Sequence, residues 1–204
     1  MKKKINAIIL YASCAGNLAA NIAKDCASPM VGGYTGRGLL IPLTNTLNFA
    51  VDASNPRIIT GITMAVGDKL AVIDNVWPSA FNDSNTQSNA DGGRPKYTKT
   101  FAFRIPWRGA GTSKDIVEPL VDSPLGYLAV LEKKDRVGDG SYEIVGYGQG
   151  LTVNPDGIVR NENENDGDIV VTMSCKEQFF EVTLFDTDYA TTKAAFETLM
   201  ASSF

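Results

Sequence analysis

The sequence predicts a mainly β protein, either a β-barrel or a two-sheet β-sandwich, with one short internal helix and a carboxyl-terminal helix. Three observations predict this class. Apolar and polar residues alternate along several short runs, polar and glycine-rich segments separate those runs, and only two stretches have helical spacing. With 204 residues, 44% of them apolar and 21% charged, the chain is predicted to form a single folded domain with its own core.

Composition excludes several function classes. The chain has no histidine, which removes the commonest general base and metal ligand and with them Ser-His-Asp, Cys-His and most zinc chemistry. Three cysteines without CxxC spacing do not make a secreted disulfide framework. The net charge of −4 argues against wrapping nucleic acid, although an acidic channel through which DNA slides stays possible. No cofactor is expected.

Residues 1–38 are predicted to form an amino-terminal arm, because they are small, polar and glycine-rich after a basic start. The arm either closes one end of a barrel or lies on a neighbouring subunit. Free arms of this composition are usually disordered, so we favour an arm that is ordered by contact with the neighbouring subunit. An alternative is a lipoprotein signal ending at Cys14. Its apolar run is short and interrupted by Asn6, and Tyr11 stands where leucine is usual, so we expect no cleavage.

Half-buried strands are predicted from Leu39 onward, each with one wet face. The residues expected to face the core are Leu47, Phe49 and Val51, then Ile58, Ile62, Met64 and Val66, then Phe101, Phe103, Ile105 and Trp107. Leu70–Trp77 is apolar throughout, which predicts a strand buried on both faces or in contact with a partner.

Residues 78–96 are predicted to form a long polar loop that turns at Asp91. Loops of this length in a compact domain are either functional or disordered, and we favour ordering by contact with another copy. The candidate contacts between subunits are polar or charged side chains of this loop and of the arm, namely Asp91, Arg94, Lys96, Tyr34 and Arg37.

Two helices are predicted. The first lies within 112–125, capped by Ser113 and limited to a turn or two by Pro119. The second is carboxyl-terminal, capped by Asp186 or Thr187, and is expected to pack its aromatic face on the sheet.

The stretch 126–185 organises the chain as strand, turn, strand, polar excursion and final strand run. Gly146, Gly148 and Gly150 fall on one face of the second strand, so we expect either a close backbone approach there or a sharp bend of the sheet. In the last run the apolar parity slips at Lys176–Gln178. The slip predicts a β-bulge in a bent strand or a turn between two strands, where the chain crosses between sheets.

This stretch, with its Gly-Tyr-Gly-Gln-Gly-Leu segment and its Lys176-Glu177 pair, resembles the carboxyl-terminal half of tail tube proteins of tailed bacteriophages. The resemblance implies a β-barrel or two-sheet sandwich with a flanking helix. It also implies hexameric rings that stack into a tube, an acidic lumen through which DNA passes without specific binding, contact with other virion tail proteins, and location in the virion tail after synthesis in the host cytoplasm. Tail terminators and connectors of related fold are alternatives within this class.

Other local signals point to different classes. Residues 161–168 offer many oxygen ligands, but the glycine comes one position late for a calcium loop and Thr172 stands where its last carboxylate belongs. Hydrolysis would need a pair of carboxylates, and the candidates are Asp74, Asp115, Glu118 and Asp122. Their spacing in the sequence does not indicate a catalytic pair, so we expect that the protein is not an enzyme. Trp77 and Trp107 could form the platform of a carbohydrate-binding module, the function that would accompany a cell-surface lipoprotein.

Overall fold

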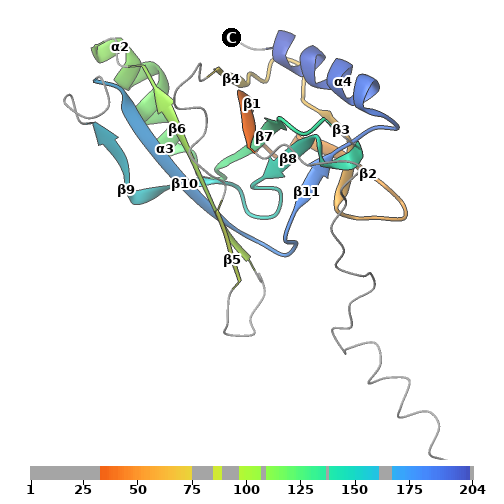
Figure 1. Cartoon of the computed structure of the whole chain (residues 1–204). Coiled ribbons are helices and arrows are strands. Elements are labelled where there is room, and N and C mark those ends of the chain that lie inside the picture. Colours follow the sequence, from red (N-terminus) through yellow and green to blue (C-terminus); the bar gives the residue numbers. More distant parts are fainter. Residues whose placement is uncertain are drawn as a thin grey trace, which may run out of the picture. The chain divides into compact units, whose positions relative to one another are not determined.

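The computed structural model describes residues 33–74, 85–88, 97–106, 109–136, 138–160 and 167–202, which belong to one compact unit (Figure 1). The strands are β1 (Tyr34–Pro42), β2 (Asn48–Val51), β3 (Ile58–Thr63), β4 (Ala71–Asp74), β5 (Asn85–Ser88), β6 (Tyr97–Ile105), β7 (Tyr127–Lys133), β8 (Tyr142–Val145), β9 (Thr152–Arg160), β10 (Ile169–Glu177) and β11 (Val182–Leu184). The helical elements are α2 (Ala110–Thr112), the π-helical turn η1 (Ser113–Val117), α3 (Glu118–Asp122), the 3₁₀ turn η2 (Gly138–Gly140) and α4 (Tyr189–Ala201).

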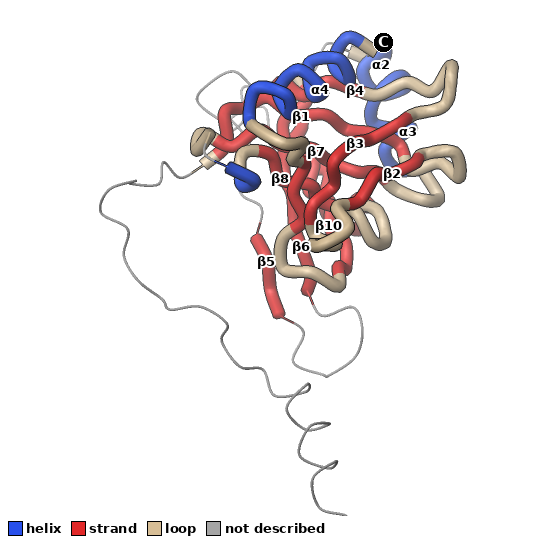
Figure 2. Tube along the Cα trace, turned by 90° about the vertical axis from the view of Figure 1, so that its right-hand side faces the viewer, coloured by secondary structure: helices blue, strands red, loops and turns tan. Residues whose placement is uncertain are grey.

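The described strands form two sheets and no closed barrel, which confirms the two-sheet alternative. The seven-stranded sheet has the order β2-β3-β11-β8-β7-β1-β4, and the four-stranded sheet has the order β5-β6-β10-β9. Neighbouring strands are antiparallel, apart from the parallel pair β11 and β3. Both predicted helices are present, and α4 lies along the seven-stranded sheet (Figures 1 and 2).

Two hydrophobic clusters explain the burial patterns of the strands. One cluster lies between the sheets and joins Phe101, Phe103 and Met173 to Ala129 and Leu131 of β7. The other lies between the opposite face of the seven-stranded sheet and Phe196 of α4. Strand β7 therefore buries both faces, whereas β6 alternates between buried and half-buried positions, as the sequence predicted.

The final strand run is two strands joined by a turn. β10 belongs to the four-stranded sheet and β11 to the seven-stranded sheet, so the parity slip marks a crossing between sheets, one of the two predicted alternatives. The chain passes from one sheet to the other at this turn. The buried residues are therefore odd-numbered before it (Val171 and Met173) and even-numbered after it (Val182 and Leu184).

Several predicted boundaries are wrong. The predicted arm overlaps β1, which starts at Tyr34 because its backbone pairs with β7, and the predicted loop 78–96 contains β5, which pairs with β6. In β3 the fully buried residue is Ile59, while Val66 lies in a turn and is exposed. Residues 1–32 of the arm, and 78–84 and 89–96 of the loop, lie outside the described residues.

Neither predicted helix cap is correct. Ser113 lies inside helical backbone without a capping bond, and the π-helical turn η1 ends two residues before Pro119, which has no N–H to donate to a regular helix. For α4 the cap is Asp188, whose Oδ1 accepts the backbone N–H of Thr191 at 2.8 Å. No helix in the described part of the chain combines the length and apolarity that a membrane crossing requires.

Candidate functional site

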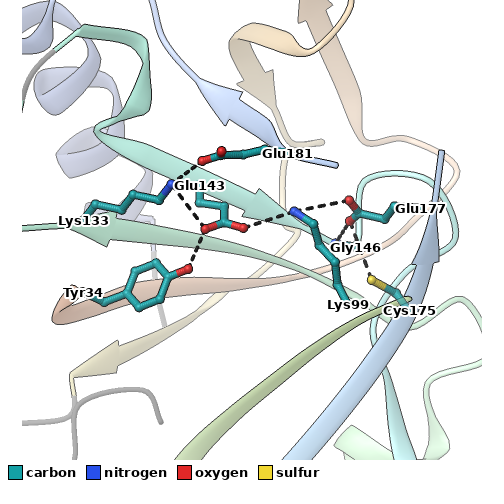
Figure 3. Close-up of polar contacts among 8 residues, drawn as sticks. All are labelled: Tyr34, Lys99, Lys133, Glu143, Gly146, Cys175, Glu177 and Glu181. Atoms are coloured by element: carbon teal, nitrogen blue, oxygen red, sulfur yellow. Dashed lines mark hydrogen bonds and ion pairs between the residues drawn. The ribbon is translucent and has the colours of Figure 1, made fainter. Parts of the chain in front are cut away.

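A cluster of charged side chains lies buried between the two sheets. We call Tyr34, Lys99, Lys133, Glu143, Glu177 and Glu181 the ionic cluster (Figure 3). Lys99 and Glu177 come from the four-stranded sheet, while Glu143 and Lys133 come from the seven-stranded sheet. It is the largest buried concentration of charge among the described residues and the natural place to look for chemistry.

Lys99 is the central cation of the cluster and is 0% exposed. Its Nζ donates to Glu143 Oε1 at 3.1 Å and lies 3.6 Å from Glu177 Oε2. The bridge therefore ties the facing surfaces of the two sheets through a single side chain. Charges this deeply buried persist only when they are paired and hydrogen-bonded.

Two further groups contact Glu143 besides Lys99. The Tyr34 hydroxyl donates to Glu143 Oε2 at 2.5 Å, and Lys133 Nζ lies 3.5 Å from the same oxygen while also bonding Glu181. Burial alone would raise the pKa of Glu143, but Lys99, the Tyr34 hydroxyl and Lys133 outweigh it and lower the pKa below its ordinary value. For Lys133, burial lowers the pKa, but the two glutamates outweigh burial and raise it.

Glu177 fastens the turn that follows β8. Its Oε1 accepts the backbone N–H of Gly146 at 2.6 Å and lies 3.6 Å from Cys175 Sγ. Burial, followed by the Glu177 carboxylate, raises the pKa of Cys175 to about 12. The thiol is therefore protonated at neutral pH and is a poor nucleophile.

The prediction that Gly146, Gly148 and Gly150 share one face of a strand is wrong. Strand β8 ends at Val145, and residues 146–150 form a turn that is closed by a 3.0 Å hydrogen bond from Gly150 N–H to Gly146 O. The predicted close backbone approach is confirmed. A Cβ on Gly146 would lie 2.5 Å from the carbonyl oxygen of Tyr127, and one on Gly150 would meet Leu125 O. Both glycines have positive φ, whereas Gly148 does not, and a Cβ on Gly148 would make only an ordinary contact, 3.8 Å from Lys176 O.

The predicted contacts between subunits are only partly described. Tyr34 belongs to the ionic cluster, and Arg37 lies 3.7 Å from Glu132 and 3.2 Å from the sulfur of Met200. Both side chains thus have partners within the chain, and their role between subunits stays a prediction. The loop residues Asp91, Arg94 and Lys96 lie outside the described residues, as do Trp77, Trp107 and most of the oxygen-rich segment.

The four carboxylates considered for hydrolysis lie apart from the ionic cluster and are exposed. Across the described ranges, no group of three or more Cys, Asp or Glu side chains is placed to hold a metal ion. The residues that line a groove of about 250 Å³ between α3 and β9 include no titratable side chain, and those that line a hollow of about 60 Å³ beside β1 include only Asp68 and Lys69. The ionic cluster joins the two sheets through the contacts of Lys99 with Glu143 and Glu177.

The chain has no match. No family model fits the sequence, and neither a curated protein nor a solved structure shows significant similarity to it.

Sequence reasoning missed Lys99, Glu143 and Glu177, although two of them follow the alternation it used. Lys99 precedes Phe101 by two positions and Glu177 follows Cys175 by two, so both share the inward parity of their strands. Extending the alternation through the charged residues would have found them. Glu143 gives no such signal, because every residue of β8 is buried.

Proposed function

We propose that this protein is a virion structural subunit, the repeating unit of a phage tail tube, whose copies form rings that stack around a passage for DNA. The resemblance that motivates the proposal covers 126–185, and this stretch supplies β7 to β11. Its hairpin, its glycine turn and its crossing between sheets together form the centre of the fold. A terminator or connector ring of the same tail is the alternative within this class.

The observation that carries the proposal is that both sheets are open. The described strands leave four sheet edges without a neighbour, at β2 and β4 of one sheet and at β5 and β9 of the other. An unpaired edge presents backbone N–H and C=O groups that template pairing with another chain. Such edges suit a protein that polymerises. Repeating the same contact from copy to copy gives a ring if the rotation between neighbouring copies adds up to a full turn.

The ionic cluster supports a mechanical role. It connects the two sheets by charged hydrogen bonds across their interface rather than exposing reactive groups. Such a cluster fixes how one sheet sits on the other, which suits a subunit that must repeat the same geometry in every ring. The net charge of −4 suits a wall along which DNA slides without binding.

Sedimentation velocity over a wide range of protein concentration tests the proposal. We expect the chain to shift from a single-chain species to discrete large oligomers or long rods as concentration rises. A terminator would stop at the ring, whereas a tube protein would continue to rods. A single-chain species at every concentration contradicts self-assembly.

A further inference from the structure

A groove lies between α3 and the edge strand β9, which are neighbours in Figure 1. It has a volume of about 250 Å³, and its lining combines apolar residues (Leu120, Val121, Val153, Pro155 and Ile158) with polar ones (Ser123, Thr152 and Asn154). Val121 is 56% exposed although it lies directly on the groove. Apolar side chains gathered around a hollow at an open sheet edge are typical of an interaction surface.

Three acidic residues are sequence neighbours of the residues that line the groove, and we call them its acidic rim. Asp122 follows Val121 along α3, Glu118 lies one turn earlier, and Asp156 follows Pro155 along β9. All three side chains are exposed, and none of them forms an ion pair with another described residue. The groove therefore favours an apolar group that is accompanied by cations.

The same chain carries such a group on the crossover between β10 and β11, residues 178–181. Phe180 is 59% exposed, and its ring meets the edge of Tyr97 at a centroid distance of 5.8 Å. The exposed cation Lys176 is the second-last residue of β10, and the exposed Arg57 lies over the ring of the neighbouring Phe179 at 5.0 Å. The crossover thus carries an exposed aromatic side chain, and two basic residues lie close to it in the sequence or beside its neighbour.

We propose that the α3–β9 groove of one copy receives Phe180 of a second copy, with Lys176 and Arg57 facing the acidic rim. A cavity of about 150 Å³ holds a benzene molecule, so the groove has room for a benzyl side chain. The charges are complementary, which orients the two copies. Phe180 does not reach the groove of its own chain, since the groove and the crossover lie at different ends of the four-stranded sheet (Figure 1).

The contact is head-to-tail, because the surface given by one copy differs from the surface used on the next. Contacts of this type generate closed rings or open filaments. The contact rests on the self-assembly proposed above and identifies the surfaces through which it would occur.

Two variants test the contact, Val121→Asp in the groove and Phe180→Asp on the crossover. Each places a charge in the buried centre of the contact, so we expect each to raise the concentration needed for assembly at least about tenfold. Mixing them is the decisive step. The intact crossover of the first variant fits the intact groove of the second, which yields a 1:1 pair whose outer ends are blocked.

Val66→Asp is the matched control. Val66 is 108% exposed in a turn and belongs neither to the groove lining nor to the crossover, so this variant should assemble like the unchanged protein. Circular dichroism of each variant checks that it is folded. If the unchanged protein assembles and the two variants assemble equally well, the contact is wrong while self-assembly stands. The contact is also wrong if the mixture stays monomeric where the unchanged protein assembles. If the unchanged protein never assembles, the proposed function itself fails.

Discussion

Replacing Lys99 by methionine removes the cation that two buried carboxylates share. Methionine fills a similar space, so the main change is electrostatic: Glu143 and Glu177 lose their partner at 3.1 and 3.6 Å. Removing one member of a buried ion pair typically costs 3–5 kcal/mol, so we expect a loss of about 4 kcal/mol in the free energy of unfolding. For a domain of this size the midpoint of thermal unfolding would fall by roughly 10 °C.

The loss should depend on pH with a definite sign. The folded-state pKa of Glu143 is lowered, so in the unchanged protein its stabilisation is present above the ordinary value of 4.5 and is lost as pH falls through the lower folded-state value. Without Lys99 the pKa of Glu143 loses the largest of the interactions that lower it, so protonation of Glu143 becomes easier. Protonation at low pH then removes the unpaired buried charge from the variant. The difference in the free energy of unfolding between the variant and the unchanged protein therefore becomes smaller below about pH 4.5.

Urea unfolding at pH 7 and at pH 4 measures both effects. Lys193→Met is the matched control: it removes an exposed pair with Glu197 at 3.7 Å and should cost about 0.3–0.5 kcal/mol. Adding Glu143→Gln and Glu177→Gln to Lys99→Met should recover stability, because no buried charge is then left unpaired. A loss below about 1 kcal/mol for Lys99→Met at pH 7, or no narrowing at pH 4, refutes the role given to the cluster.

Two further predictions test the surroundings of the cluster. Gly146→Ala should destabilise the protein by at least about 1 kcal/mol, because alanine is strained at positive φ and its Cβ would meet a backbone carbonyl, whereas Gly148→Ala should be nearly neutral; equal urea midpoints for the two variants would contradict this. In a Cys14→Ser, Cys26→Ser background, Cys175 should resist a thiol reagent at pH 8 until urea unfolds the chain, since its pKa is about 12; rapid labelling of the folded protein would show the thiol to be accessible.

The sequence predicted the fold class where patterns reflect burial directly. Alternation in Phe101, Phe103 and Ile105 predicts a sheet with one wet face, and the parity slip before Val182 predicts a crossing between sheets. These predictions are confirmed because the apolar side chains of these strands are buried in the two hydrophobic clusters. The extent of β8 was mispredicted, because positive φ at Gly146 turns the backbone out of the strand.

The ionic cluster was harder to predict. Lysine and glutamate are usually exposed, so Lys99 and Glu177 read as the ends of strands rather than as core residues. Only pairing brings them together, since the register that sets Cys175 opposite Lys99 is a property of the folded sheet. Glu143 comes from the other sheet, and its approach depends on how the two sheets pack.

Negative-stain electron microscopy of the concentrated protein tests self-assembly most directly. If copies complete each other's sheet edges, the images contain rings of uniform diameter or hollow rods built from such rings. Fields of small separate particles at the highest concentration that stays in solution would contradict the proposed tail tube, and with it the contact between Phe180 and the α3–β9 groove.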